Sequence, residues 1–146
     1  MTMNLIPGVE STGSALSAEK IRLEIIAQNI ANANTTQDHE GNVYKRKEVV
    51  FEEYITSPER RTPGYVDENL YKGVKVVDVY DDPSPGRMIY NPGHPHADAN
   101  GMVEMPNVEM SREMIDLISA SRAYEANLTV VKTSRRMAQQ AIAIGR

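Results

Sequence analysis

The sequence predicts an α+β fold, in which long N- and C-terminal helices pair antiparallel in a coiled-coil-like manner and carry a small β-rich insert between them. Two observations lead to this prediction. Apolar residues recur at heptad spacing near both ends of the 146-residue chain, whereas seven of its eight prolines lie between residues 37 and 106, among β-branched and aromatic runs. We therefore expect residues 1–34 and 107–146 to form one discontinuous helical domain and residues 35–106 to form the insert.

The C-terminal stretch carries two apolar seams. The first joins residues seven apart, Leu117, Tyr124, Val131 and Ala138, to a neighbouring line with Met114, Leu128 and Ile142, in which Ser121 and Arg135 fill the gaps. The second runs through Ala120, Ala123, Val130, Met137, Ala141 and Ile144. A helix that begins at an Asn107 N-cap would be about 50–60 Å long. Such a helix cannot bury two seams inside so short a chain, so it needs partners.

The N-terminal stretch has the same character. Its stripe holds Val9, Leu16, Leu23 and Ile30, with Leu5, Ile26 and Ala33 three positions further along the heptad, and Ile21 and Ile25 lie on another side. The helix should begin near Pro7, because proline suits only a first turn, and should end between Asn32 and Thr36. Apolar residues on two sides predict several neighbours.

Four asparagines allow two interpretations, and these are Asn29, Asn32, Asn34 and Asn127. A buried asparagine at a helix interface fixes register, whereas one at a helix end caps the backbone. Capping is favoured for Asn32 and Asn34. Asn127 lies in mid-helix, where register-setting and simple exposure fit equally well.

The insert reads as a small sheet. Residues 44–54, 74–80 and 87–90 are predicted strands, and together they would make a three-stranded sheet. Val49 and Phe51 should share one face of the first strand, and Val74, Val76 and Tyr80 one face of the second. Residues 56–69 hold two prolines and are predicted to be a loop.

Composition excludes several classes of protein. The net charge is −4, and residues 37–82 account for it with eleven acids against seven bases, so a nucleic-acid partner is not expected. No apolar run is long enough for a membrane span, and the N-terminal residues do not have the pattern of a cleavable signal peptide. The chain has no cysteine.

Two clusters could carry chemistry. His94, His96 and Asp98 resemble metal ligands, and Asp81 with Asp82 forms a carboxylate pair that could serve acid–base catalysis. Each cluster adjoins prolines, so a stiffened turn is the favoured interpretation of both. We predict no catalytic residue, no metal and no cofactor.

Several motifs, in order along the chain, resemble the bacterial flagellar rod and hook proteins, the axial protein family. They are residues 14–18 (SALSA), 26–35 (IAQNIANANT), 90–95 (YNPGHP), 97–101 (ADANG), 106–108 (PNV) and 119–127 (SASRAYEAN). The family usually has an aromatic residue where Met102 stands and an acidic one where Asn91 stands. Residues 53–72 match no motif of the family.

The resemblance implies a structural subunit of the proximal rod of the flagellar basal body, assembling helically around the export channel and transmitting torque. It implies a periplasmic location, reached through the flagellar type III apparatus without a cleaved signal peptide. The implied partners are other copies of the chain, other rod proteins, and components of the basal-body rings and the export gate. Such a monomer is expected to be partly disordered at both ends.

The heptad positions predict the assembly interface, which comprises Leu16, Leu23, Ile26, Ile30, Leu117, Tyr124, Asn127, Leu128, Val131, Ala138 and Ile142. Three alternatives stay open. The chain could be another axial protein of the rod–hook–junction set, a metal-dependent hydrolase using His94 and His96, or a cytosolic coiled-coil adaptor of a secretion system.

Overall fold

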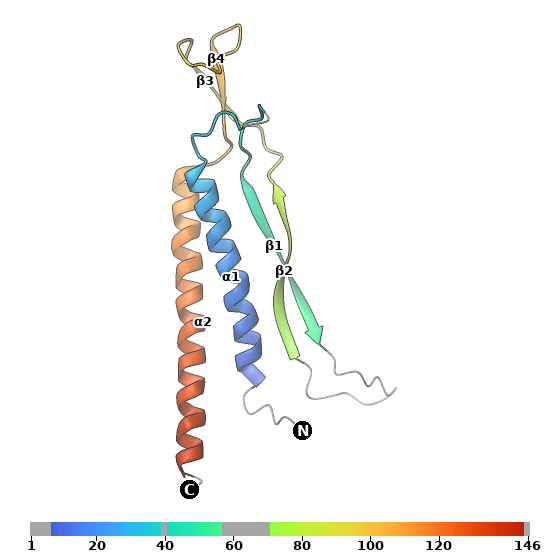
Figure 1. Cartoon of the computed structure of the whole chain (residues 1–146), viewed down its shortest axis with the longest axis vertical. Coiled ribbons are helices and arrows are strands. Elements are labelled where there is room, and N and C mark those ends of the chain that lie inside the picture. The colour runs from blue at the N-terminus through green and yellow to red at the C-terminus, as the bar shows by residue number, and fades with distance from the viewer. Residues whose placement is uncertain (1–6, 39–40, 57–70, 145–146) are drawn as a thin grey trace, which may run out of the picture.

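The computed structural model describes residues 7–38, 41–56 and 71–144. The elements follow the order α1 (Pro7–Ala31), β1 (Lys47–Thr56), β2 (Tyr71–Asp81), β3 (Arg87–Tyr90), β4 (Met102–Met105) and α2 (Met110–Ile144). The two helices run antiparallel, α1 packs between α2 and the β1–β2 ribbon, and the β3–β4 hairpin projects beyond the end where α1 finishes (Figure 1). The predicted α+β architecture is confirmed. Of the predicted loop over residues 56–69, Thr56 belongs to β1, and the rest lies outside the described residues, as does Leu5.

Helix α1 has neighbours on two sides, as its two apolar sides predict. It packs against α2 and against both strands of the β1–β2 ribbon, and Ala18, Ile26 and Asn29 are its buried residues. The helix begins at Pro7 and ends at Ala31, close to both predicted limits. Asn32 closes it, because its side-chain amide donates to the Gln28 carbonyl at 2.9 Å and its carbonyl accepts from the Thr35 amide at 3.0 Å. Capping by Asn32 is thus confirmed, whereas Asn34 is exposed in the turn that follows.

The most buried line of α2 differs from the predicted seam. Leu117, Tyr124, Val131 and Ala138 are half-buried, but Glu113, Ala120 and Ser134 are the buried residues of the helix. These three share a heptad line with the half-buried Asn127. In the line predicted beside the seam, Met114 and Ile142 are 55% and 64% exposed. Small and polar side chains therefore form the centre of the seam, and small ones let two helices approach closely.

The β1–β2 ribbon contains a bulge that changes its faces. Val50 pairs with Asp78 but Phe51 pairs with Val76, so β2 has one extra residue at this point. Val74 and Val76 therefore share a face with Val49, Phe51 and Val79, whereas Tyr80 lies on the other face, beside Glu48. The predicted face of β1 is confirmed, and the prediction that Tyr80 shares a face with Val74 and Val76 is wrong. Val49 and Phe51 line a cavity with Ile25 and Ile26 of α1, so this apolar face is turned towards α1.

The insert forms two sheets, so the predicted three-stranded sheet is wrong. β3 pairs antiparallel with β4, a strand that was not predicted, and not with β1 or β2. Residues 91–101 fold back in a series of turns that ends at Gly101, where φ is +75°. β4 is only four residues long, and only Val103 within it is buried. Strands are predicted from alternating apolar and polar residues, and a strand of four residues with one buried side chain shows little of this alternation.

Two glycines give opposite predictions for stability. A Cβ at Gly86 would lie 2.2 Å from the Met105 carbonyl oxygen, whereas one at Gly13 in α1 would meet nothing within 4 Å. Gly86→Ala should therefore lower the free energy of unfolding by more than about 1 kcal/mol, and Gly13→Ala should raise it by roughly 0.5–1 kcal/mol. Urea unfolding followed by circular dichroism measures both changes. Equal effects of the two substitutions would contradict the close approach at Gly86.

Candidate functional site

A buried polar cluster joins both helices to the start of the ribbon. Its centre is Glu113 of α2, which is 0% exposed. One carboxylate oxygen accepts from Arg46 Nε at 2.6 Å, and the other accepts from Asn29 Nδ2 of α1 at 3.1 Å. A buried carboxylate is tolerated only where its oxygens are paired in this way. Glu113 thus links α2 to α1 and to the segment that leads into β1.

Asn29 uses its whole side-chain amide at this junction. Its oxygen accepts from the Tyr44 hydroxyl and from the Lys47 backbone amide, both at 2.9 Å. Its nitrogen donates to the Lys47 carbonyl at 2.9 Å as well as to Glu113. Of the two roles open to asparagines near this helix end, Asn29 therefore fixes register between α1, α2 and β1. Burial, followed by the nearby carboxylates of Asp81 and Glu113, raises the pKa of Tyr44.

Arg46 extends the cluster to the ribbon. Its guanidinium pairs with Glu48 and lies 3.5 Å from the Asp116 carboxylate, and Glu48 also accepts from the Tyr80 hydroxyl. Burial lowers the pKa of Arg46, but the hydrogen bonds that its guanidinium donates to Glu113 and Glu48 outweigh this effect, and the net shift is upward. The Tyr80 hydroxyl, and after it Arg46, lowers the pKa of Glu48. The cluster therefore holds its charges in fixed pairs.

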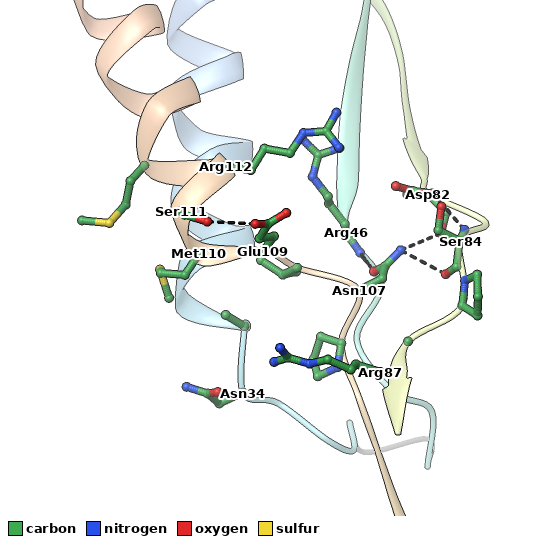
Figure 2. A pocket seen from close by; sticks show the side chains of 16 residues that line it. Asn34, Arg46, Asp82, Ser84, Arg87, Asn107, Glu109, Met110, Ser111 and Arg112 are labelled. Carbon is green, nitrogen blue, oxygen red and sulfur yellow. Dashed lines mark hydrogen bonds between the residues drawn. The ribbon is translucent and has the colours of Figure 1, made fainter. Parts of the chain in front are cut away.

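A groove of about 1010 Å³ lies beside the cluster, between the first turn of α2 and the base of the β3–β4 hairpin (Figure 2). Asn107 forms one wall. Its side-chain oxygen accepts from the Arg46 backbone amide at 2.7 Å, and its nitrogen donates to the carbonyls of Asp82 and Ser84, each at 3.2 Å. Asn107 is therefore not the N-cap of α2, which begins at Met110. Hydrogen bonds from Ser84 lower the pKa of Asp82.

The histidines belong to the turns between β3 and β4. His94 Nδ1 accepts from the His96 backbone amide at 3.1 Å, and His96 Nδ1 lies 2.9 Å from the Thr36 hydroxyl. Asp98 accepts from the backbone amides of Asn100 and Met102, both at 2.8 Å. These contacts are those of a stiffened turn. Within residues 7–38, 41–56 and 71–144, no group of three or more histidine, aspartate or glutamate side chains is arranged to hold a metal ion.

The residues predicted to form an assembly interface are mostly half-buried within the subunit. Ile26 is buried, Ile142 is exposed, and nine are half-buried, namely Leu16, Leu23, Ile30, Leu117, Tyr124, Asn127, Leu128, Val131 and Ala138. Ile26 thus offers almost no surface to a second subunit. The other ten residues keep some exposed surface, and their role in assembly stays a prediction.

The opposite side of α2 is uncovered and carries several large apolar side chains. We call it the open face of α2, and its members are Met114, Ile115, Ile118, Val130 and Met137, which are 48–68% exposed. Val130 and Met137 belong to the predicted second seam. In the described part of the chain α2 packs against α1 alone among the helices and strands. Neither helix there is long and apolar enough to cross a membrane.

Glu113 and Arg46 were missed by the sequence analysis. Both are charged and lie beside other charged residues, so no local pattern distinguishes them from a solvated surface. The one available signal is that Glu113 stands seven residues before Ala120 and four before Leu117, at a position where a heptad seam expects an apolar side chain.

Removal of the central carboxylate tests the cluster. Glu113→Ala should lower the free energy of unfolding by about 3 kcal/mol or more, because it leaves buried donors of Arg46 and Asn29 without a partner. Asp116→Ala is the matched control, since its contact with Arg46 is long and its side chain is 31% exposed. It should cost less than about 1 kcal/mol. Denaturant unfolding measures both, and equal losses would contradict the central position of Glu113.

Glu48 predicts a response to acid. Because its pKa is lowered in the folded chain, it stabilises the fold above the unfolded-state value and loses this contribution as the pH falls through the folded-state value, below the ordinary 4.5. Glu48→Gln should therefore flatten the decline of unfolding free energy with acid. Glu52→Gln is the control, since Glu52 pairs with Lys75 on the same ribbon with both side chains more than half exposed. Unfolding in urea at neutral pH and in steps below 4.5 measures the slopes, and parallel slopes for Glu48→Gln and the unmodified chain would refute the assignment.

Two family profiles match the two helical ends of the chain. Residues 10–37 match the family described as flagella basal body rod protein, and residues 99–144 match the family described as flagellar basal body rod FlgEFG protein C-terminal. The matches cover most of α1 and all of α2.

Curated relatives match along the whole chain. The chain is 38% identical to the flagellar basal-body rod protein FlgC of Borreliella burgdorferi, over 97% of this chain and 98% of the relative. It is 39% identical to the FlgC protein of Yersinia enterocolitica, over 98% and 99%, and 33% identical to that of Bacillus subtilis, over 99% and 100%. By identity and by coverage, the chain belongs to the FlgC family of flagellar basal-body rod proteins.

Proposed function

We propose that this chain is a structural subunit of the proximal rod of the flagellar basal body, where copies assemble helically around the export channel and transmit torque. The relatives that match it end to end carry the name of a basal-body rod protein. In this proposal the helices at 1–34 and 107–146 form the wall of the tube, and residues 35–106 form its outer part. Export occurs through the flagellar type III apparatus without a cleaved signal peptide.

One observation carries the proposal, and it is the open face of α2. Ile115 and Ile118 are 68% and 54% exposed on a helix that the rest of the described chain covers on one side only. Large exposed apolar patches mark interaction sites in soluble proteins. The partners are other copies of the chain, other rod proteins, and ring and export-gate components of the basal body. The half-buried residues predicted for assembly would contribute through the surface that they leave exposed.

The proposal gives the chain no catalytic role. The polar groups that are buried together, Asn29, Arg46 and Glu113, bond to one another and to the backbone. They therefore join elements of the fold, and the proposal needs no reaction at this junction.

A second candidate is another axial protein of the rod–hook–junction set. It is favoured by the match of residues 99–144 to a family described by the FlgEFG proteins. Basal bodies isolated without hooks separate a rod subunit from a hook or junction subunit, because the rod subunit stays in these particles whereas the other two are absent from them.

Ile118→Asp tests the proposed function. It places a charge on the open face, so the monomer should keep its helix content while rod assembly, and with it motility, is lost in a strain that has no other copy of the gene. Gln28→Asp is the matched control, because Gln28 is exposed on α1 and lies outside the open face. Circular dichroism and swimming in soft agar provide the two measurements. A motile Ile118→Asp strain would sink the proposal.

A further inference from the structure

The β1–β2 ribbon has two long edges, because each strand pairs with only one neighbour. In an antiparallel pair, the backbone groups of successive residues point alternately to the partner strand and outwards. Lys47 points outwards, because the Asn29 side chain accepts from its amide and donates to its carbonyl. By this alternation, Val49 and Phe51 also present their backbone groups at the edge of β1. The Asn29 side chain therefore bonds to Lys47 as a neighbouring strand would.

The other edge, along β2, is blocked at two outward amides. Val79 donates its amide to the Asp78 carboxylate at 2.8 Å, and Val74 donates to a serine hydroxyl of α1 at 3.1 Å. Proteins block sheet edges in such ways to prevent further strand pairing. Among the described residues, nothing bonds to the outward backbone groups of Val49 and Phe51. We call this part of β1 the open edge.

A cavity of about 380 Å³ lies along the open edge. Of the ribbon, only β1 lines it, through Lys47, Glu48, Val49 and Phe51, and Ile25 of α1 contributes to its apolar wall. Phe51 is 38% exposed although its face is turned towards α1, so the cavity is accessible. An extended peptide in this cavity could pair with β1 as a third strand, the mode of recognition called β-augmentation.

The cavity has an excess of positive charge. Its two acids, Glu48 and Asp116, both lie against the guanidinium of Arg46. Three further bases line it, and these are Arg22, Lys47 and Arg112. Arg22 lies 3.9 Å from Glu19, and the other two have no ion-pair partner in the part of the chain that the structure describes. A carboxylate that enters the cavity would therefore meet positive charge that the subunit itself does not neutralise.

The two faces of an added strand would have different surroundings. Side chains that point towards α1 would meet the apolar wall and the three bases, because Lys47 shares this face of β1 with Val49 and Phe51. Side chains that point the other way would lie beside Glu48 and Glu52, which share the opposite face of β1. Acidic residues therefore fit only the face that is turned to α1.

We propose that the cavity binds an extended segment of another polypeptide, which adds to the open edge and directs a carboxylate, flanked by apolar side chains, towards α1. Hydrogen bonds with the backbone of Val49 and Phe51 hold the segment, and the three bases select its carboxylate. The site goes beyond the proposed rod function and does not depend on it, because residues of a single subunit form it.

A synthetic peptide tests the site in the full-length chain. In this blocked probe, threonine alternates with valine, glutamate and valine in turn, so the glutamate lies between two valines on one face. The probe should bind, and amide hydrogen exchange followed by NMR should show new protection at Val49 and Phe51 but none at Val79. A peptide with lysine in place of the glutamate should bind about tenfold more weakly.

Three results would overturn the proposal. They are an absence of binding, equal affinity for the two peptides, and binding that leaves the amides of Val49 and Phe51 unprotected. Protection of Val49 that rises with protein concentration in the absence of peptide would show that a second copy fills the cavity, and would also overturn the choice of partner.

Two valine-to-proline substitutions distinguish the edges. Val49→Pro removes an outward amide without removing a bond between β1 and β2, which edge strands tolerate, and should abolish binding of the glutamate peptide. Val79→Pro is the matched control, because Val79 pairs with Val49 and its amide is already bonded to Asp78. It should leave binding unchanged, and equal losses in the two variants would contradict pairing at the open edge. Urea unfolding checks that both variants are folded.

A charge reversal tests the selection without altering the backbone. Arg22→Glu should weaken binding of the glutamate peptide by about tenfold and strengthen binding of the lysine peptide. Lys20→Glu is the control, because the Lys20 side chain is 70% exposed on α1 and does not line the cavity. It should change neither affinity. An equal effect of the two reversals would show that the overall charge of the chain, and not this cavity, selects the peptide.

Discussion

The burial of one carboxylate constrains the whole architecture. Glu113 is 0% exposed, and its oxygens are satisfied only when Arg46 and Asn29 reach it together. An isolated buried charge costs several kcal/mol, so any arrangement that separates α1, α2 and the start of β1 is penalised at once. The helix pair and the ribbon therefore meet in one defined geometry, although few apolar side chains are buried.

The apolar core is small for a chain of 146 residues. Among the described residues the buried apolar side chains are Ala18, Ile26, Val103, Val108 and Ala120, whereas many large ones remain exposed. This distribution is expected if the chain completes its apolar burial only against other subunits. The polar cluster then defines the subunit's shape before assembly, and the open face of α2 is left for the neighbours.

The sequence predicted the helices well because their signals are local and repeated. Heptad spacing, Pro7 and the asparagine-rich stretch after Ile30 located α1 closely, and the absence of proline after Pro106 located α2 within three residues. The second sheet was missed because β4 is four residues long and pairs with β3 across turns. The bulge in β2 and the Glu113 cluster were missed for a different reason. Both arise from contacts between segments far apart in the chain, and the one local trace is that Glu113 stands at an otherwise apolar heptad position.

The bond between Asn29 and Glu113 also determines how the helix pair responds to shear. If α1 slid along α2 by one turn, about 5.4 Å, the two side chains would separate and Glu113 would lose a partner while still buried. The Lys47 backbone, held by the same asparagine, would be pulled along or released. The side chain of Asn29, which bonds α1 to α2 and to the start of β1, therefore opposes sliding. Two helices with a purely apolar seam could shift by one turn and still bury apolar side chains against each other. In this pair the polar contact allows only one register.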